Sequence, residues 1–225
     1  MDPARTASSG RSRSIALASL ACFAALTALM WHSTHLTGWE RPLLTASNRI
    51  PVPFRDLWIS TFQPLPFAVM TLALGSLAFV FGRRRMAIAG AVGCFGAVIA
   101  TEVVFKPLVD RTRRHDVGLY RTHIIRVGGN LFPSAHVTAA AALAMFVWLL
   151  LGRRAVLAPI LAIVPFIVAC SVMHEGLHYP ADVIGAALFA PAFVFLVVDI
   201  DAHLADVIEP PDGVKQPAMS AAERE

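Results

Sequence analysis

The chain has 225 residues, of which 56% are hydrophobic and only 15% are charged, and its formal net charge is +4. A soluble domain carries about 25% charged residues. Here the few charges cluster in short patches between long apolar runs. This pattern excludes a disordered chain, a coiled coil and an ordinary soluble enzyme. It does not indicate nucleic acid as a partner, because no stripe of basic and aromatic residues stands apart from the apolar runs.

Six apolar stretches approach or reach the roughly 17–25 residues that a helix needs to cross a hydrocarbon core about 30 Å thick. They are Ile15–Trp31, Phe62–Gly82, Met86–Phe105, Ala135–Gly152, Ala155–Met173 and Ala181–Val198. We therefore expect an all-α, polytopic membrane protein, a bundle of six transmembrane helices. The first stretch is too long for a signal peptide and lacks a clear cleavage site, so we interpret it as a retained anchor.

This interpretation divides the chain into three parts. Residues 1–14 are expected to form a cytoplasmic N-terminal tail, and residues 15–206 the six-helix membrane domain. Residues 207–225 are polar and contain proline and glycine, which is typical of a disordered C-terminal tail.

Arginines in the short loops predict the orientation. Arg83–Arg85 form one turn and Arg153 and Arg154 another, both on the side of the N-terminal arginines in a six-helix arrangement. Cytoplasmic loops collect Lys and Arg, so we expect a multi-pass protein of the cell (inner) membrane with both termini in the cytoplasm. The opposite side also carries cations, between Lys106 and Arg126. Either it binds an anionic ligand or the topology is inverted.

Three polar clusters lie on that opposite side. The first runs from Lys106 to Arg113 and is followed by Arg114. Lysine gives a point charge and arginine a planar fork of donors, and both suit a phosphate group. The alternative is a lysine that reaches the membrane surface beside a solvated basic loop. Glu102 lies one helical turn before Lys106 and is expected to pair with it.

The second cluster, Phe132–His136, opens the fourth apolar stretch. Pro133 and Ser134 are typical of a helix start, and the backbone N–H groups there can bind an anion. His136 falls in the first turn, where it could donate a proton to a leaving oxygen. The alternative is a helix cap with an incidental histidine.

The third cluster runs from Ser171 to Asp182. His178 precedes Pro180, which marks the start of the last helix, and Asp182 falls in its first turn. Asp182 could hold one ring nitrogen of His178 and leave the other nitrogen as a nucleophile. The alternative is that Asp182 only complements the helix dipole.

In order and spacing, the three clusters resemble the signature motifs of the type 2 phosphatidic acid phosphatase family, which shares its catalytic core with bacterial acid phosphatases and vanadium haloperoxidases. Its patterns are K-x6-R-P, P-S-G-H and S-R-x5-H-x3-D. The first pattern matches Lys106 and Arg113, the second Pro133, Ser134 and His136, and the third Ser171, His178 and Asp182. The resemblance covers roughly residues 60–200.

The resemblance implies a metal-independent lipid phosphate phosphatase without a cofactor. The orientation predicted from the arginines of the short loops places its site on the outer or periplasmic side. His178 would be the nucleophile that forms a phosphohistidine, His136 the general acid and Asp182 the orienting partner. Lys106, Arg113 and Ser134 would bind the phosphate. The partners would be the bilayer and a phosphorylated lipid. Undecaprenyl pyrophosphate, phosphatidate and phosphatidylglycerophosphate all fit, with a lateral opening expected along His32–Thr61, where Trp39, Phe54 and Trp58 lie at the interface.

Three positions depart from the family patterns. Arg114 replaces a proline, Ala135 a glycine and Val172 an arginine. A hydrogen bond to a charged group contributes about 1.5–3 kcal/mol, so the loss of the arginine predicts weaker phosphate binding. Auxiliary candidates for its place are Arg114, Arg126 and His174. A non-catalytic or weakly active relative that binds lipid phosphate is therefore the first alternative.

A second alternative is a membrane zinc metalloprotease. His174-Glu175-Gly176-Leu177-His178 fits H-E-x-x-H, in which two histidines on one helix face bind zinc and the glutamate is the general base. Gly176 and Pro180 both disfavour the helix that this motif needs. The zinc interpretation also leaves the first two clusters unexplained.

Overall fold

The computed structural model of the protein describes residues 3–33, 36–111, 130–154 and 156–208. Over these ranges the ordered elements are all helical. In chain order they are α1 (Pro3–Met30), α2 (Glu40–Ser47), α3 (Arg55–Thr61), α4 (Pro64–Val80), α5 (Arg84–Ile99), the π-helical turn η1 (Ala100–Phe105), α6 (Lys106–Val109), α7 (Ala135–Leu150), α8 (Leu157–His174) and α9 (Pro180–Ile208).

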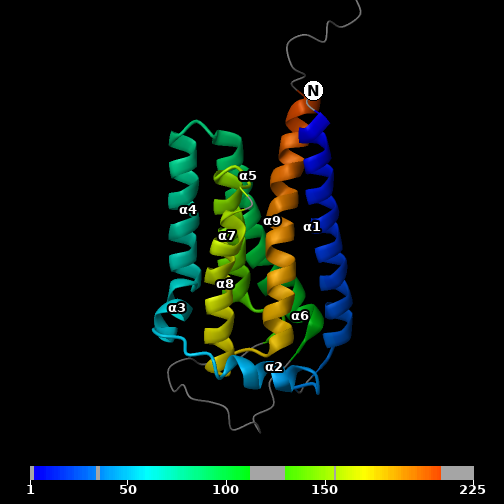
Figure 1. Ribbon diagram of the computed structural model, residues 1–225, viewed down its shortest axis with the longest axis vertical. Helices are drawn as coiled ribbons and strands as arrows, with labels where there is room; N and C mark the ends of the chain where they lie inside the picture. Colours follow the sequence, from blue (N-terminus) through cyan, green and yellow to red (C-terminus); the bar gives the residue numbers. More distant parts are fainter. Residues whose placement is uncertain (1–2, 34–35, 112–129, 155, 209–225) are drawn as a thin grey trace, which may run out of the picture.

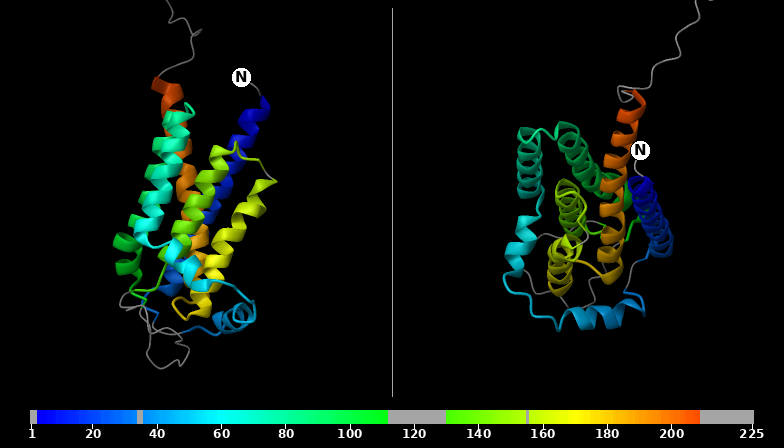
Figure 2. Two further views of the ribbon diagram at one scale, coloured as in Figure 1. Left: turned by 90° about the vertical axis from the view of Figure 1, so that its left-hand side faces the viewer. Right: turned by 45° about the horizontal axis from the view of Figure 1, so that its top comes forward.

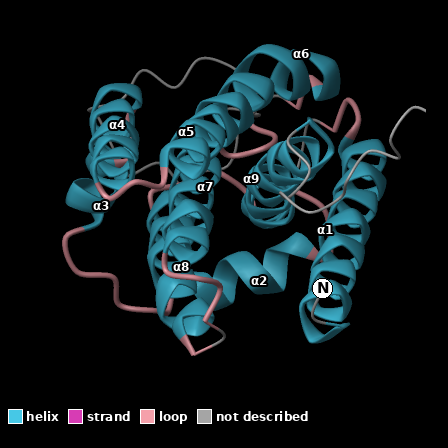
Figure 3. Cartoon of the chain, turned by 90° about the horizontal axis from the view of Figure 1, so that it is seen from above, coloured by secondary structure: helices cyan, strands magenta, loops and turns pink. Residues whose placement is uncertain are grey.

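The long helices run side by side, and α2 lies across the end of the bundle opposite the N-terminus (Figures 1 and 2). Helix α9 is the centre of the packing, because it contacts α1, α5 and α7. Viewed along the bundle, α1 and the α5–α7 pair lie on opposite sides of α9 (Figure 3). Helix α7 also packs on α8, and α4 is attached to the rest mainly through α5.

The outer helices present apolar side chains away from the core. Leu65, Val69 and Val80 of α4 and Ile88 and Val92 of α5 are all more than half exposed. A helix that is apolar on its outward face is suited to hydrocarbon rather than to water. The protein is therefore an all-helical integral membrane protein.

The expected number of six membrane spans is not established. Among the described residues four helices are long and apolar enough to cross a membrane, and the pair α3 and α4, bent by 64°, makes up to five. The remaining apolar helix, α7, has 16 residues and falls below that length. All six predicted apolar stretches nevertheless form helices, so six spans stays a prediction.

Helix boundaries differ from the apolar stretches in two places. Helix α1 begins at Pro3, so it continues through most of residues 1–14, which we expected to be a tail. The segment His32–Thr61 contains two short helices, α2 and α3, that the apolar pattern does not reveal. The hydrophobic pattern of the sequence reveals the apolar part of a helix. It gives no comparable signal for a polar extension of that helix, as in α1, or for short helices of mixed polarity, such as α2 and α3.

The fold places the three polar clusters at one end of the bundle. The turns α4–α5 and α7–α8, which carry the short arginine clusters, lie at the end near the N-terminus, whereas α2, α6 and the start of α9 lie at the other (Figure 1). A close contact between an aromatic ring and a glycine joins two elements at this second end. The buried Phe132 ring lies over Gly185 of α9, where a Cβ atom would approach it to 2.6 Å. A glycine is therefore needed for the segment before α7 to pack on α9.

Candidate active site

The turn between α8 and α9 presents His178. Helix α8 ends at His174, and Gly176 adopts a left-handed backbone with φ of 66°. The N–H groups of Gly176 and Leu177 donate to the carbonyls of Met173 and Val172 at 3.0 and 2.8 Å. This glycine-terminated ending satisfies the last helix carbonyls and reverses the chain. His178 is thereby held, largely buried, just before Pro180 begins α9.

Asp182, in the first turn of α9, faces His178. Its Oδ2 lies 3.5 Å from His178 Nδ1 and accepts the Tyr179 N–H at 2.7 Å. The Asp182 side chain is completely buried. With Nδ1 turned to the carboxylate, the Nε2 atom of His178 is the nitrogen that faces away from it.

His136 lies across from His178, with ring centroids 6.4 Å apart. It stands in the first turn of α7, and its Nε2 is 3.1 Å from the side-chain nitrogen of Gln63. Gln63 precedes Pro64 at the start of α4. The motif analysis missed Gln63, and its position one residue before a proline-initiated helix was the only available signal.

Ser134 joins the start of α7 to α9. Its backbone N–H donates to the Asp182 carbonyl at 3.0 Å, and its side chain is fully buried. Two buried polar atoms at this helix start lack a hydrogen-bond partner within the described part of the chain: Ser134 Oγ and His136 Nδ1. Buried polar atoms normally have partners, so this cluster is suited to a polar ligand.

Lys106 begins α6 directly after the π-helical turn η1, a wider turn that often marks functional sites. Its Nζ lies 2.6 Å from Glu102 Oε1, the pairing expected from their spacing. The ammonium group is also within electrostatic range of His136. Lys106 therefore lies at the same end of the bundle as the two histidines and contributes a positive charge beside them.

Arg111 and Glu40 were both missed by the motif analysis, and both side chains are completely buried. Arg111 Nη1 donates to Asp182 Oδ1 at 2.7 Å, and Nη2 donates to the two Glu40 oxygens at 3.0 and 2.8 Å. Burial lowers the pKa of the guanidinium, but Asp182 and Glu40 outweigh this and raise it above its ordinary value. Arg111 thus stays charged and connects α2 to the carboxylate that faces His178.

The H-E-x-x-H residues do not have the geometry of a zinc motif. Because α8 ends at His174, the two histidines do not share one helix face. Glu175 instead forms an ion pair with Arg55 of α3, with Oε1 and Nη1 3.2 Å apart. Among the described residues, no group of three or more His, Cys, Asp or Glu side chains is arranged to hold a metal ion.

Three of the predicted phosphate-binding candidates, Arg113, Arg114 and Arg126, lie outside the described residues. His174 is the last residue of α8. Val172, where the family pattern has arginine, is completely buried and belongs to the hydrophobic core. The structure thus brings together Lys106, Ser134, His136, His178 and Asp182.

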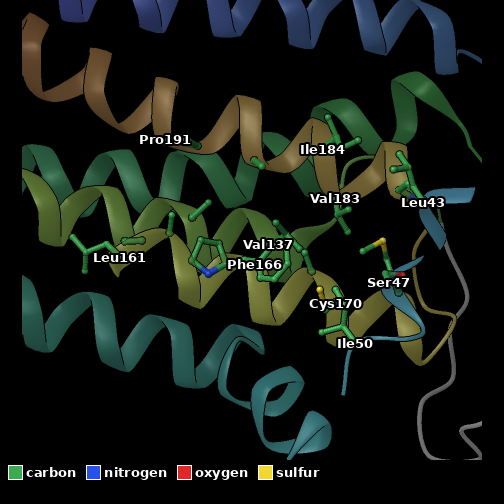
Figure 4. A pocket seen from close by; sticks show the side chains of 18 of the residues that line it. Leu43, Ser47, Ile50, Val137, Leu161, Phe166, Cys170, Val183, Ile184 and Pro191 are labelled. Carbon is green, nitrogen blue, oxygen red and sulfur yellow. The ribbon is translucent and has the colours of Figure 1, made fainter. Parts of the chain in front are cut away.

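An apolar groove of about 660 Å³ lies beside the site, between α7, α8 and α9 (Figure 4). Its lining includes Val137, next to His136, and Pro180, two residues after His178, and it reaches Trp148 and Pro191 toward the other end of the bundle. Leu43 of α2 and Ile50, three residues after α2, line the end of the groove that lies at α2. Its dimensions and apolar walls suit a hydrocarbon chain.

Comparison with known proteins identifies the class. The profile of the PAP2 superfamily matches residues 86–203, which contain all three motif clusters. This match covers more than half of the chain, and the protein belongs to the PAP2 superfamily. Membership supports a membrane lipid phosphate phosphatase in general.

One similar solved structure is described as the "first transmembrane PAP2 type phosphatidylglycerolphosphate phosphatase from Bacillus subtilis". The two chains are 19% identical, the TM-score is 0.49, and the match covers 84% of this chain and 96% of the other. No curated protein matches the sequence.

Proposed function

We propose that the protein removes phosphate from a membrane lipid phosphate or polyprenyl pyrophosphate through a phosphohistidine at His178. The observation that carries this proposal is the pair of histidines at one end of the bundle. Asp182 holds Nδ1 of His178 at 3.5 Å, and the ring of His136 lies opposite, 6.4 Å away between centroids. This pair supports an attacking nitrogen on one side of a phosphate and a proton donor on the other.

In the first step, Nε2 of His178 attacks phosphorus while the bond from phosphorus to the leaving oxygen breaks. His136 gives its proton to that oxygen. In the second step, water attacks the phosphohistidine, His136 takes a proton from the water, and the bond between phosphorus and Nε2 breaks. Asp182 stabilises the positive charge that the His178 ring carries in between.

Phosphate binding in this proposal falls to Lys106, Ser134 and the start of α7. Lys106 contributes a positive charge, and Ser134 has a buried hydroxyl without a partner within the described residues. The backbone N–H groups at the start of α7 favour an anion there. Arg113 remains a proposed phosphate ligand from its motif position, and no step of the proposed reaction is assigned to a metal ion.

The lipid nature of the substrate is supported by the groove between α7, α8 and α9. A phosphate at the two histidines and a hydrocarbon chain in this groove would belong to one molecule, since Val137 and Pro180 line the groove next to the site. The arginine-rich turns at the opposite end favour a cytoplasmic location for that end. The site would then face the periplasm or the outside of an inner membrane, with both termini in the cytoplasm.

Covalent trapping tests the proposed intermediate. Detergent-purified protein is mixed with a lipid phosphate that carries ³²P in its phosphate group and is denatured in alkali within the first turnovers. We expect labelled protein whose label is stable in alkali and lost in acid, and no label in His178→Ala. His203→Ala, at the far end of α9, is the matched control and should label normally. Label that persists in His178→Ala, or a wild-type protein that releases phosphate without any label, would contradict the phosphohistidine.

Val172 favours one other function, the binding of lipid phosphate without turnover, because a buried valine supplies no charge to the phosphate. Binding of a lipid phosphate by wild type and His178→Ala alike, with no phosphate released by either, would establish that alternative.

A further inference from the structure

The surroundings of Asp182 contain more than the histidine that the reaction uses. Its Oδ1 accepts from Arg111 Nη1 at 2.7 Å, while its Oδ2 faces His178 Nδ1 at 3.5 Å. Arg111 is itself fixed by both oxygens of Glu40, at 3.0 and 2.8 Å. The guanidinium carbon also lies 5.0 Å from the centre of the Tyr179 ring. A continuous chain of contacts thus runs from Glu40 through Arg111 and Asp182 to His178.

Glu40 is anchored as firmly as Arg111. Its Oε2 accepts from the Thr37 N–H and hydroxyl at 2.9 and 2.7 Å, and its Oε1 accepts the N–H of Ala181 at 3.0 Å. Ala181 precedes Asp182 at the start of α9. Glu40 therefore ties α2 both to Arg111 and to the backbone that carries Asp182.

The charges of this chain suit the proposed reaction. Two carboxylates face one guanidinium, and all three side chains are completely buried. A buried charge is strongly coupled to its neighbours because little water screens it. The excess negative charge would be offset when the His178 ring becomes positive in the phosphohistidine, so the chain favours the charge that forms during the reaction.

We propose that Glu40 and Arg111 are positioning residues that orient Asp182 and, through it, His178 for attack on phosphorus. This inference rests on the proposed phosphatase function. Arg111 and Glu40 are completely buried within the described residues, so neither is assigned a contact with substrate. The effect of replacing them should therefore appear in kcat and not in phosphate binding.

Steady-state kinetics on detergent-purified protein test this, with a lipid that the wild type hydrolyses among phosphatidate, phosphatidylglycerophosphate and undecaprenyl pyrophosphate. Arg111→Gln should lower kcat about tenfold to a hundredfold, since small misplacement of a nucleophile has effects of this size. KM and inhibition by inorganic phosphate should change by less than about threefold, because uniform substrate binding is retained. Asp199→Asn, which breaks an ion pair with Arg13 at the far end of α9, is the control and should leave kcat unchanged.

A double-mutant cycle separates positioning from a general structural role. If Arg111 acts through Asp182, then Arg111→Gln combined with Asp182→Asn should be no slower than Asp182→Asn alone, to within about twofold. This pair removes Asp182 together with its cation, so of the two carboxylates that face Arg111 only Glu40 is left buried without one. Losses that multiply, or a phosphate inhibition constant that weakens in proportion to kcat, would overturn the proposal.

Glu40→Gln provides the test if Arg111→Gln does not fold, because it keeps the Arg111–Asp182 pair and the side-chain volume. A fall in kcat at constant KM supports the proposal, and an unchanged kcat overturns it. Arg111→Lys keeps the charge but not the fork of donors, so it should retain more activity than Arg111→Gln. If wild type releases no phosphate from any of the three lipids, the proposed function fails and this inference fails with it. An active wild type with unaffected variants refutes only the inference.

Discussion

At the scale of single residues, the backbone of Val172 holds the turn that carries His178. Its carbonyl accepts the N–H groups of Leu177 and His178 at 2.8 and 3.3 Å, while its side chain packs in the core. The family arginine at this position would supply a charged donor, which the valine side chain lacks. In the proposed reaction, the positive charge that binds the phosphate therefore comes from other elements, and Lys106 is the described candidate.

Replacement of Glu175 tests whether the protein is a phosphatase or a zinc protease. In the structure Glu175 pairs with Arg55, so Glu175→Gln should leave the rate of phosphate release within about threefold of wild type, since no catalytic role is removed. The ion pair between the buried Glu175 and the partly exposed Arg55 would be weakened, with a stability loss of about 1–3 kcal/mol. Phosphate release and thermal unfolding in detergent measure the two effects.

Arg55→Gln is the matched control, because it breaks the same ion pair from the other side. Similar stability and activity in the two variants support a structural pair. Loss of all activity in Glu175→Gln alone, with restoration of wild-type activity by zinc after chelation, would instead support the protease.

The sequence motifs predicted contacts between residues that are close together in the sequence. The spacing of His178 and Asp182 predicts their contact within one helical turn, and that of Glu102 and Lys106 does the same. Glu40 and Arg111 were not predicted because their partners are distant: 71 residues separate Arg111 from both Glu40 and Asp182, and 141 separate Glu40 from Ala181. An arginine among other basic residues in a loop is typical of a solvated surface, and only the fold shows that Arg111 is buried.

At the scale of elements, the groove between α7, α8 and α9 arises because α8 and α9 contact each other little although both pack on α7. The α7 side of the groove includes two small side chains, Ala141 and Ala144. Small residues on one helix leave room that longer side chains on its neighbours do not fill.

Filling this groove should affect long lipids more than short ones. Ala144→Phe places a ring on its α7 side, so KM for a long-chain lipid phosphate should rise about tenfold relative to wild type, the effect of losing one to two kcal/mol of apolar contact. A short-chain analogue should be little affected. Val69→Phe, on the outward face of α4, controls for an added ring facing lipid. Equal effects of Ala144→Phe on both substrates would show that the groove does not hold the tail.

The length of an apolar stretch predicts each long helix, because a helix that crosses the hydrocarbon core needs a continuous run of apolar residues. It does not predict α2 and α3, which have seven or eight residues and mixed polarity. Nor does it predict η1, since an extra residue in a helical turn leaves no pattern in composition. These short elements position Glu40, Gln63 and Lys106, which explains why the surroundings of the site were less predictable than the bundle.

At the scale of the whole molecule, the account requires one orientation in the membrane. Labelling with a membrane-impermeant thiol reagent tests this, after Cys22, Cys94 and Cys170 are replaced by alanine. Asn48→Cys, just after α2, should react in intact cells, because it lies at the same end of the bundle as the candidate site. Leu151→Cys, in the turn between α7 and α8, should react only after the membrane is permeabilised. The reverse pattern would establish the inverted topology and place the site in the cytoplasm.

The most direct test of the central claim is phosphate release from phosphatidate, phosphatidylglycerophosphate and undecaprenyl pyrophosphate by detergent-purified protein in EDTA, with His178→Ala measured beside it. The account predicts release from at least one of these lipids by wild type, undiminished by EDTA and lost in His178→Ala. No release from any of them, or release that survives in His178→Ala, would contradict it.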